Sequence, residues 1–231
     1  MATIDTRNRL VLALDVDTAD EARTRAGALQ EWFGIVKVGL ELFTRCGPEI
    51  VQQLRSDGFE IFLDLKLHDI PTTVRNAAAS IAALDVRFTT FHATGGAAML
   101  RAGLVGLADG THPGSRRPMG LAVTVLTSDT DTTAFATRLA TAREAGMPGI
   151  VCSAQELSQV QSVDTGLITM VPGVRLAGAR LDDQARVAAP GDAIRSGASC
   201  LVIGRTVTAA ADPRAAAIAV TAEVELALSG A

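Results

Sequence analysis

The sequence predicts an α/β protein, a (β/α)8 barrel in which residues 1–231 form a single domain. Three observations lead to this prediction. Short apolar runs of strand length alternate with segments of helical length along the whole chain, and we count eight such units. Most of these runs are continuously apolar, as is typical of parallel strands that helices cover. The length of 231 residues suits one barrel or two small domains, but no linker or shift in composition divides the chain.

The predicted strands follow one another at regular intervals. They are Leu10–Asp15, Ile35–Gly39, Phe59–Lys66, Arg87–His92, Leu121–Thr127, Gly149–Ser153, Leu167–Val171 and Cys200–Gly204. An open, doubly wound sheet would show the same alternation, and counting strands does not exclude it. The barrel interpretation also predicts where functional residues lie, because the active sites of such barrels are at the carboxyl ends of the strands. Here several of those ends carry charged residues.

The segments between the strands carry helix signals. Their length and composition predict helices at Ala19–Trp32, Pro48–Asp57, Thr72–Leu84 and Ala97–Asp109. The spacing of a capping box occurs twice, at Thr18 with Glu21 and at Ser153 with Glu156. Pro71 stands where a first helical turn should begin. The alanine-rich tail, Ala209 to Ala231, predicts a terminal helix that covers the barrel.

The composition argues against several classes of partner and location. The net charge is −4 without long runs of like charge, so bulk binding to nucleic acid or membrane surfaces is not expected. Aromatic residues make up only 3%, which disfavours stacking on single-stranded nucleic acid. The first apolar run ends at Asp15, too short for a signal peptide or a membrane span. Cys46, Cys152 and Cys200 form no C-x-x-C pair, which fits a reducing, cytoplasmic location, and the last two are expected to be buried, inert thiols.

Lysine occurs at only two positions, Lys37 and Lys66, and arginine supplies every other basic residue. Both lysines lie in apolar, strand-like runs. Lysine has a compact ammonium whose pKa moves readily with its surroundings, whereas arginine stays protonated. A coding bias toward arginine could leave two lysines by chance, but their placement favours a need for lysine chemistry.

The densest group of charged residues surrounds Lys66. Asp64 precedes it by two residues, so both side chains should share one face of the strand at the barrel mouth. Asp69 follows in the turn, and Lys37 belongs to the neighbouring strand. Alternating charges hold one another ionised, and such an array could present Lys66 as a proton donor beside a fixed carboxylate. The alternative is a structural ion-pair network at the rim.

A second candidate site follows the last two strands. Pro172 and Arg175 open a loop that runs on to Gln184, and Gly204 with Arg205 ends the final strand. The loops after strands 7 and 8 of such barrels often bind phosphate through backbone N–H groups. Glycine permits close approach of the backbone, and arginine offers a bidentate fork. We therefore expect a phosphate site here.

No metal site is expected, because His68, His92 and His112 lack ligand spacing. We expect His92 to be held by a neighbour at the rim and His68 to orient the acids on either side of it. The chain has no dinucleotide fingerprint, P-loop or nucleophile elbow. Ser153 is better explained as a helix cap than as a nucleophile.

The run FLDLKLHDIPTTV, from Phe62 to Val74, resembles the signature of the orotidine 5′-phosphate decarboxylase family. The similarity extends from Leu10 to about Pro213. It includes Leu12–Asp15, Lys37–Gly39, Val123–Ser128, Pro172–Arg175, Asp183–Gln184 and Gly204–Arg205. One departure is Thr72, where the family more often has asparagine, at a position to which we assign no chemistry.

The resemblance implies a cytoplasmic carboxy-lyase without cofactor or metal. It would convert orotidine 5′-monophosphate to uridine 5′-monophosphate and CO2 in pyrimidine biosynthesis, with the whole chain as its catalytic domain. Lys66 would protonate carbon 6 of the pyrimidine, and Asp64 would face the departing carboxylate. Lys37 with Asp15 would hold the ribose and the charged array.

The same resemblance implies a homodimer with shared active sites. The residues that would reach into the partner's site are Asp69, Ile70 and Thr73. The residue that would address the pyrimidine is Thr127. Those that would bind phosphate are Arg175, Gln184, Gly204 and Arg205.

Two other functions share parts of this pattern. Related sugar-phosphate decarboxylases and hexulose-phosphate synthases hold magnesium through a carboxylate on strand 2, where this chain has Lys37. The pair Ile70-Pro71 also matches the orotidylate enzymes rather than those relatives. A non-catalytic nucleotide-binding barrel is the other alternative, but the intact lysines and aspartates argue against it.

Overall fold

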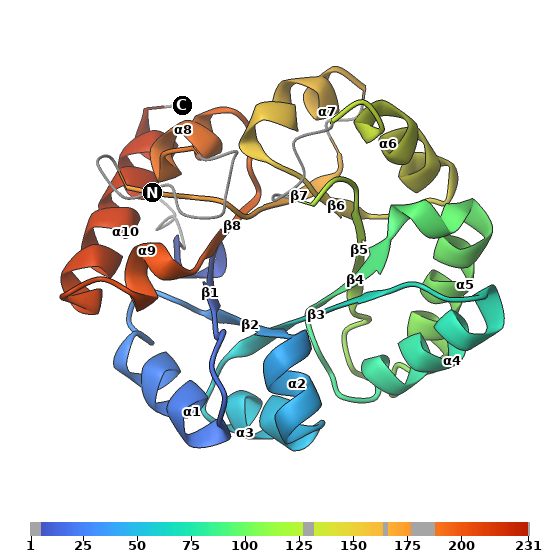
Figure 1. Cartoon of the computed structure of the whole chain (residues 1–231), viewed down its shortest axis with the longest axis horizontal. Coiled ribbons are helices and arrows are strands. Elements are labelled where there is room, and N and C mark those ends of the chain that lie inside the picture. Colours follow the sequence, from blue (N-terminus) through green and yellow to red (C-terminus); the bar gives the residue numbers. More distant parts are fainter. Residues whose placement is uncertain (1–5, 127–131, 164–165, 177–187, 231) are drawn as a thin grey trace.

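The computed structural model describes residues 6–126, 132–163, 166–176 and 188–230. Within this part of the chain, parallel strands close into a barrel in the order β1 to β8, and β8 returns to pair with β1. The strands are β1 Leu10–Ala13, β2 Ile35–Gly39, β3 Glu60–Leu67, β4 Phe88–His92, β5 Met119–Val123, β6 Gly149–Val151, β7 Ile168–Val171 and β8 Cys200–Ile203. Helices surround this ring on the outside (Figure 1). The predicted barrel is confirmed, and the open sheet is excluded.

Some strands end earlier than predicted, because the chain leaves the ladder before it reaches the polar rim. The last bond of β1 toward β2 runs from the Leu14 N–H to the Lys37 carbonyl at 3.1 Å, and Asp15 lies beyond it. After β5, Thr124 gives both its N–H and its hydroxyl to the Val151 carbonyl, at 3.3 and 2.9 Å. After β1 and β5 the rim residues therefore lie beyond the strand ends, whereas Lys37, Asp64 and Lys66 lie within β2 and β3.

The described helices begin close to where the sequence signals place them. They are α1 Ala19–Ala28, α2 Leu40–Cys46, α3 Glu49–Ser56, α4 Pro71–Ala82, α5 Gly96–Asp109, α6 Phe135–Glu144, α7 Leu157–Val163, α8 Pro190–Arg195, α9 Arg205–Thr208 and α10 Pro213–Ser229. The Thr18 hydroxyl accepts from the Glu21 N–H at 3.3 Å, and Ser153 forms the predicted capping box with Glu156. Helix α2 was not predicted. The terminal helix starts at Pro213 rather than in the alanines before it, because the Asp212 carboxylate caps it there.

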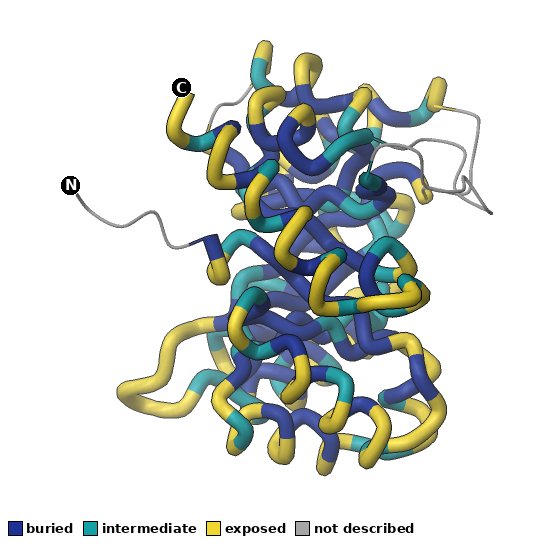
Figure 2. The backbone as a smooth tube through the Cα atoms, turned by 90° about the vertical axis from the view of Figure 1, so that its left-hand side faces the viewer, coloured by how far each residue is buried: buried dark blue, intermediate teal, exposed yellow. Residues whose placement is uncertain are grey.

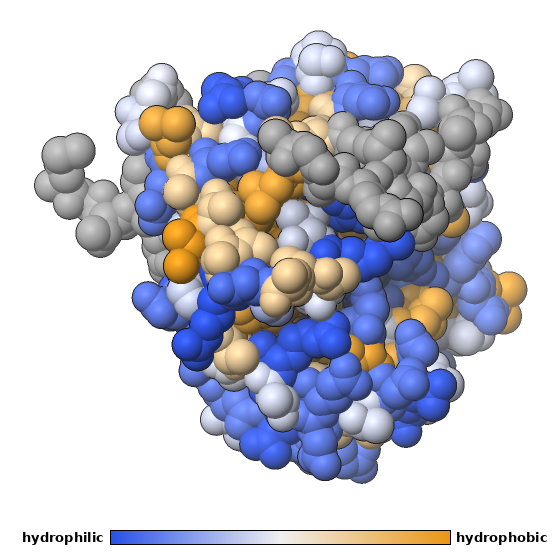
Figure 3. Space-filling model, turned by 60° about the vertical axis from the view of Figure 1, so that its left-hand side comes forward, coloured by the Kyte–Doolittle hydropathy of each residue, from blue (hydrophilic) through white to orange (hydrophobic). Residues whose placement is uncertain are grey.

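Apolar side chains fill two regions of the barrel. A smaller group lies inside the ring of strands and includes Val11, Phe62 and Met170, whereas the larger group lies between strands and helices. Figure 2 shows the buried backbone running through the centre, with exposed residues toward the outer helices and the two ends. Figure 3 turns the α10 side forward and shows apolar atoms gathered on this face above a hydrophilic lower part; Ile218 and Leu226 of α10 are exposed.

Helices α4 and α5 approach each other closely because α5 presents glycine to its neighbour. A Cβ atom on Gly106 would lie 2.1 Å from the Arg75 carbonyl oxygen, and one on Gly110 would lie 2.0 Å from that of Ala79. Neither position has room for a side chain. Since α4 directly follows the loop with Asp69, this packing fixes the base of that loop.

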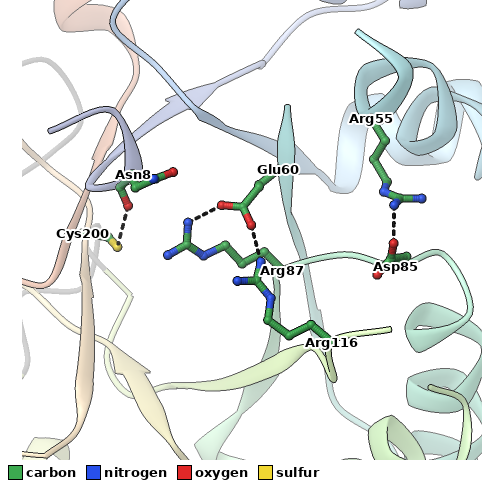
Figure 4. A network of polar contacts seen from close by, with 7 residues as sticks. All are labelled: Asn8, Arg55, Glu60, Asp85, Arg87, Arg116 and Cys200. Carbon is green, nitrogen blue, oxygen red and sulfur yellow. Dashed lines mark hydrogen bonds and ion pairs between the residues drawn. The ribbon is translucent and has the colours of Figure 1, made fainter. Parts of the chain in front are cut away.

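An ion-pair network covers the amino-terminal end of the barrel (Figure 4). Glu60, at the start of β3, binds both Arg87 and Arg116, and Arg55 binds Asp85. This end of such barrels generally serves stability rather than chemistry. Charged pairs here therefore hold the loops that precede β4 and β5.

The cysteines behave as predicted from their apolar surroundings. All three are free thiols, and Cys152 and Cys200 are buried. Burial raises the pKa of Cys200, whose Sγ lies 3.9 Å from the Asn8 carbonyl oxygen (Figure 4). The thiolate is the reactive form, so burial disfavours reaction at Cys200. Among the described residues, no helix has the length and apolar character needed to cross a membrane.

Candidate active site

Strand β3 is irregular where it carries the predicted chemistry. Its register with β4 pairs Leu63 with Thr89 and then Leu67 with Phe91, so β3 has two more residues than β4 over this stretch. Within this bulge Lys66 has a φ angle of 50°, a left-handed conformation that is uncommon for residues other than glycine. Bulges of this kind redirect side chains and are frequent beside active sites.

The bulge brings Lys66 and Asp64 into direct contact. Lys66 Nζ lies 2.8 Å from Asp64 Oδ2, and the Asp64 side chain is only 13% exposed. The other oxygen, Asp64 Oδ1, accepts the Thr90 hydroxyl of β4 at 2.9 Å. The structure therefore brings together the two residues that the sequence placed on one strand face.

Lys37 forms a second ion pair beside the first. Its Nζ lies 2.9 Å from Asp15 Oδ1, with the lysine side chain 13% exposed and the carboxylate largely in solvent. An added Cβ on Gly39 would lie 3.0 Å from the Lys37 nitrogen, so glycine leaves room for this ammonium. The site therefore contains two separate ion pairs within the chain, Lys66–Asp64 and Lys37–Asp15.

Asp69 belongs to neither pair. It is exposed, and its Oδ1 accepts the backbone N–H of Ile70 at 2.6 Å. The Ile70 side chain is 67% exposed, and Thr73 on the first turn of α4 is also exposed. The predicted array is therefore seen only in part, because Asp69 has no described contact with Asp64, Lys66 or Lys37.

A cavity of about 160 Å³ opens at the carboxyl ends of the strands. Three of its lining residues are charged: Lys37, Asp64 and Lys66. The rest of the lining is mainly apolar: Phe62, Val123, Val125, Leu126, Val151, Cys152, Pro172 and Val202. Charge on one side and apolar wall on the other suit a flat, polar ring with an ionised substituent. Pro172, a predicted site residue, contributes to this wall.

Three of the predicted phosphate residues, Arg175, Gly204 and Arg205, lie where the chain leaves β7 and β8. Arg175 is buried, and its Nη1 donates to the Val174 carbonyl at 3.1 Å and to the Thr206 hydroxyl at 3.2 Å. The Thr206 hydroxyl in turn donates to the same carbonyl at 2.7 Å. Gly204 precedes α9 as its N-cap, and Arg205 begins that helix with an exposed side chain. Two further predicted site residues, Thr127 and Gln184, lie outside the described residues.

A pair of histidines stands at the same rim. The rings of His68 and His92 stack with centroids 5.6 Å apart and planes inclined by 27°. The Thr94 hydroxyl lies 2.8 Å from His92 Nδ1, so this histidine is held by neighbours as expected. Burial lowers the pKa of His92, and the positive charges of His68, Arg138 and Lys66 lower it further. His68 makes its described ring contact with His92, rather than orienting the acids beside it.

Sequence reasoning did not identify Thr90. Its side chain is fully buried, and its hydroxyl contacts both residues that flank Leu65. The available signal was a pair of threonines, Thr89 and Thr90, inside an otherwise apolar strand, since a buried hydroxyl needs a partner.

A family model described as "Orotidine 5'-phosphate decarboxylase / HUMPS family" matches residues 8–220. The chain belongs to this family. A protein of Halorhodospira halophila named orotidine 5'-phosphate decarboxylase is 43% identical over 229 residues, covering 94% of this chain and 95% of that protein. One of Bacillus mycoides with the same name is 39% identical over 218 residues, covering 88% and 92%.

A solved structure agrees with the family assignment. The crystal structure of orotidine 5'-phosphate decarboxylase from Lactobacillus acidophilus superposes with a TM-score of 0.79 at 35% identity. The match covers 94% of this chain and 99% of that one. Members of the orotidine 5′-phosphate decarboxylase / HUMPS family thus resemble this chain over nearly its whole length.

Proposed function

We propose that the chain, acting as one catalytic barrel domain, is an orotidine 5′-phosphate decarboxylase, a carboxy-lyase of pyrimidine biosynthesis. The observation that carries the proposal is the Lys66–Asp64 pair, 2.8 Å apart, at a cavity that Lys37 also lines. Family membership over residues 8–220 supports the same activity.

The reaction needs one bond to break and one proton to be delivered. The bond between carbon 6 of the pyrimidine and its carboxylate breaks, CO2 leaves, and the electron pair stays on carbon 6. The Lys66 ammonium gives its proton to that carbon, as a positioned general acid. Asp64 faces the departing carboxylate. Its fixed negative charge repels the negative charge of the substrate carboxylate, which is lost when CO2 leaves. The apolar wall excludes water from the carbanion, which strengthens these electrostatic effects.

The remaining assigned residues bind the rest of the nucleotide. The Lys37–Asp15 pair would hold the ribose hydroxyls, because it offers a donor and an acceptor 2.9 Å apart. Arg175, Gly204 and Arg205 would bind the phosphate beside α9, and Gln184 would join them. Thr127 would contact the pyrimidine. We expect no cofactor, since a lysine proton and a fixed carboxylate supply what the reaction requires.

The proposed active form is a homodimer in the cytoplasm. The exposure of Asp69, Ile70 and Thr73 supports a shared site, because these residues follow β3, whose Asp64 and Lys66 line the cavity, and remain exposed in the single chain. A partner's Asp69 would complete the alternating array next to Lys66. Three free cysteines fit a reducing compartment.

The magnesium-dependent relatives are a weaker match to the site. Their metal needs a carboxylate on strand 2, whereas the Lys37 ammonium points into this cavity and pairs with Asp15. An ammonium at that position repels a divalent cation. The geometry therefore favours decarboxylation of a nucleotide.

The decisive experiment is an ultraviolet absorbance assay on purified protein treated with EDTA. Adding orotidine 5′-monophosphate should give the absorbance change of conversion to uridine 5′-monophosphate at an undiminished rate. Loss of turnover on chelation, with recovery on adding magnesium, would support the sugar-phosphate relatives instead. Absence of turnover with and without magnesium would contradict decarboxylation, and nucleotide binding without turnover would indicate a binding protein.

A further inference from the structure

Thr90 of β4 stands behind the reacting groups and contacts both of them. Its hydroxyl accepts the Lys66 backbone N–H at 2.8 Å and donates to Asp64 Oδ1 at 2.9 Å. The residue is fully buried. The hydroxyl therefore donates one hydrogen bond, to the Asp64 carboxylate, and accepts one, from the backbone N–H of Lys66.

The backbone bond matters because Lys66 lies in the bulge. A left-handed conformation at a residue with a side chain persists only where its surroundings hold it. Within the bulge the regular ladder between β3 and β4 is interrupted after Leu63 and resumes at Leu67. The Thr90 hydroxyl accepts the Lys66 N–H, a group that the interrupted ladder no longer binds.

The carboxylate bond fixes the second reacting group. Asp64 has two oxygens, and Lys66 Nζ takes one while Thr90 takes the other. Two bonds on opposite oxygens define the plane of the carboxylate. Without the hydroxyl, the carboxylate could rotate about its terminal torsion, which is a broad and soft one.

We propose that Thr90 is a positioning residue for decarboxylation, which locks the Asp64 carboxylate and the Lys66 backbone in one reactive arrangement. The proposal rests on the proposed function. Thr90 does not line the cavity among the described residues, so it acts through Asp64 and Lys66 rather than on the substrate. Removing its hydroxyl should lower kcat and leave KM nearly unchanged. Displaced reacting groups slow the chemical step more than they weaken substrate binding.

The chain supplies a matched control one residue away. Thr89 lies on the same strand and is equally buried, but its hydroxyl has no hydrogen-bond partner among the described residues. Thr90→Val removes the bridging hydroxyl at nearly constant shape, Thr90→Ser keeps it, and Thr89→Val removes a hydroxyl that bridges nothing.

The test measures kcat, KM and thermal stability for these three variants beside the wild type. We expect Thr90→Val to lower kcat by on the order of 10- to 100-fold, as for a lost buried bond to a charged group. Its KM should change by less than about threefold, and both Thr90→Ser and Thr89→Val should stay within about threefold of wild type. Wild-type kcat in a folded Thr90→Val, or equal losses in both valine variants, would overturn the proposal.

A crystal structure of Thr90→Val provides a readout that does not depend on turnover. We expect the Asp64 carboxylate to be rotated and its contact with Lys66 Nζ lengthened, with both restored in Thr90→Ser. An unchanged pair would contradict the positioning role even if the protein proved inactive on the nucleotide. Inactivity of the wild type would instead count against the proposed function alone.

Discussion

The proposed reaction depends directly on Lys66, because this residue would deliver the proton to the substrate. Replacing it with alanine should lower kcat by at least about 10²- to 10⁴-fold, the range for a positioned general acid. Lys66→Arg should fail similarly, since a guanidinium does not release its proton usefully. Turnover and binding of uridine 5′-monophosphate should be measured together, and we expect binding to survive in both variants. Near-normal turnover in either one would remove Lys66 from its assigned role.

His92 should make the stability of the protein depend on pH. Its pKa is lowered in the folded state by burial and by the nearby cations His68, Arg138 and Lys66. The unfolded chain therefore binds the proton more readily, so His92 lowers stability as the pH falls below its ordinary value of 6.5. Above that value the effect vanishes.

Denaturant unfolding of wild type and His92→Gln between pH 7.5 and pH 5.5 tests this expectation. The free energy of unfolding should fall less steeply with acidification in the variant. His112→Gln, at an exposed histidine, is the control and should keep the wild-type slope. Equal slopes in all three proteins would show that His92 contributes nothing to the acid sensitivity.

The sequence predicted the charged residues of the site better than the groups that hold them. Lys66 and Asp64 stood out because lysine is rare in this chain and because their spacing suits one strand face. Thr90 was not predictable in the same way, since its partners come from another strand and depend on the bulge in β3. Which carboxylate each lysine binds was also open, because Asp15 reaches Lys37 only after the strands are in register.

At the scale of elements, glycines on helices should respond in opposite directions to alanine. Gly106→Ala would place a Cβ 2.1 Å from the Arg75 carbonyl, so α4 and α5 must separate, at a cost of about 1–3 kcal/mol or more. Gly27→Ala, on α1, meets nothing within 4 Å and should stabilise the protein by about 0.5–1 kcal/mol. Chemical denaturation measures both. Equal effects at the two positions would mean that the close approach of α4 and α5 is unimportant.

The positions of elements followed from apolar runs and caps, whereas their ends depended on contacts that no local pattern contains. The predicted strand from Leu121 instead starts at Met119, where its N–H bonds the Arg87 carbonyl at the foot of β4. Helix α2 is short, and Gly47 with a φ of 65° separates it from α3. A seven-residue helix between two stronger signals lacks a periodic pattern long enough to detect.

At the scale of the whole molecule, the shared site predicts complementation between two inactive variants. Lys66→Ala and Asp69→Ala homodimers should each be nearly inactive. In a mixed dimer one site would carry both defects, and the other would combine Lys66 of one chain with Asp69 of its partner. Random re-association of equal amounts gives half mixed dimers, so about a quarter of all sites should be intact.

The measurement is activity per site after the two variants are unfolded and refolded together or co-expressed. Mixed dimers are verified by tagging each variant differently and purifying through both tags. If verified mixed dimers remain inactive, Asp69 serves its own chain, and the roles given to Ile70 and Thr73 fail with it.

Closure of the barrel also has a consequence for how the chain is made. Strand β1 finds one neighbour in β2 at once, but its other edge pairs only with β8, near the opposite end of the sequence. At translation rates of about 5–20 residues per second, roughly 10–40 seconds separate the synthesis of these two strands. Throughout that interval the nascent sheet has open edges that other chains can join. Closure of the barrel becomes possible only after β8 has been made, so the exposed edge of β1 is the last to be covered.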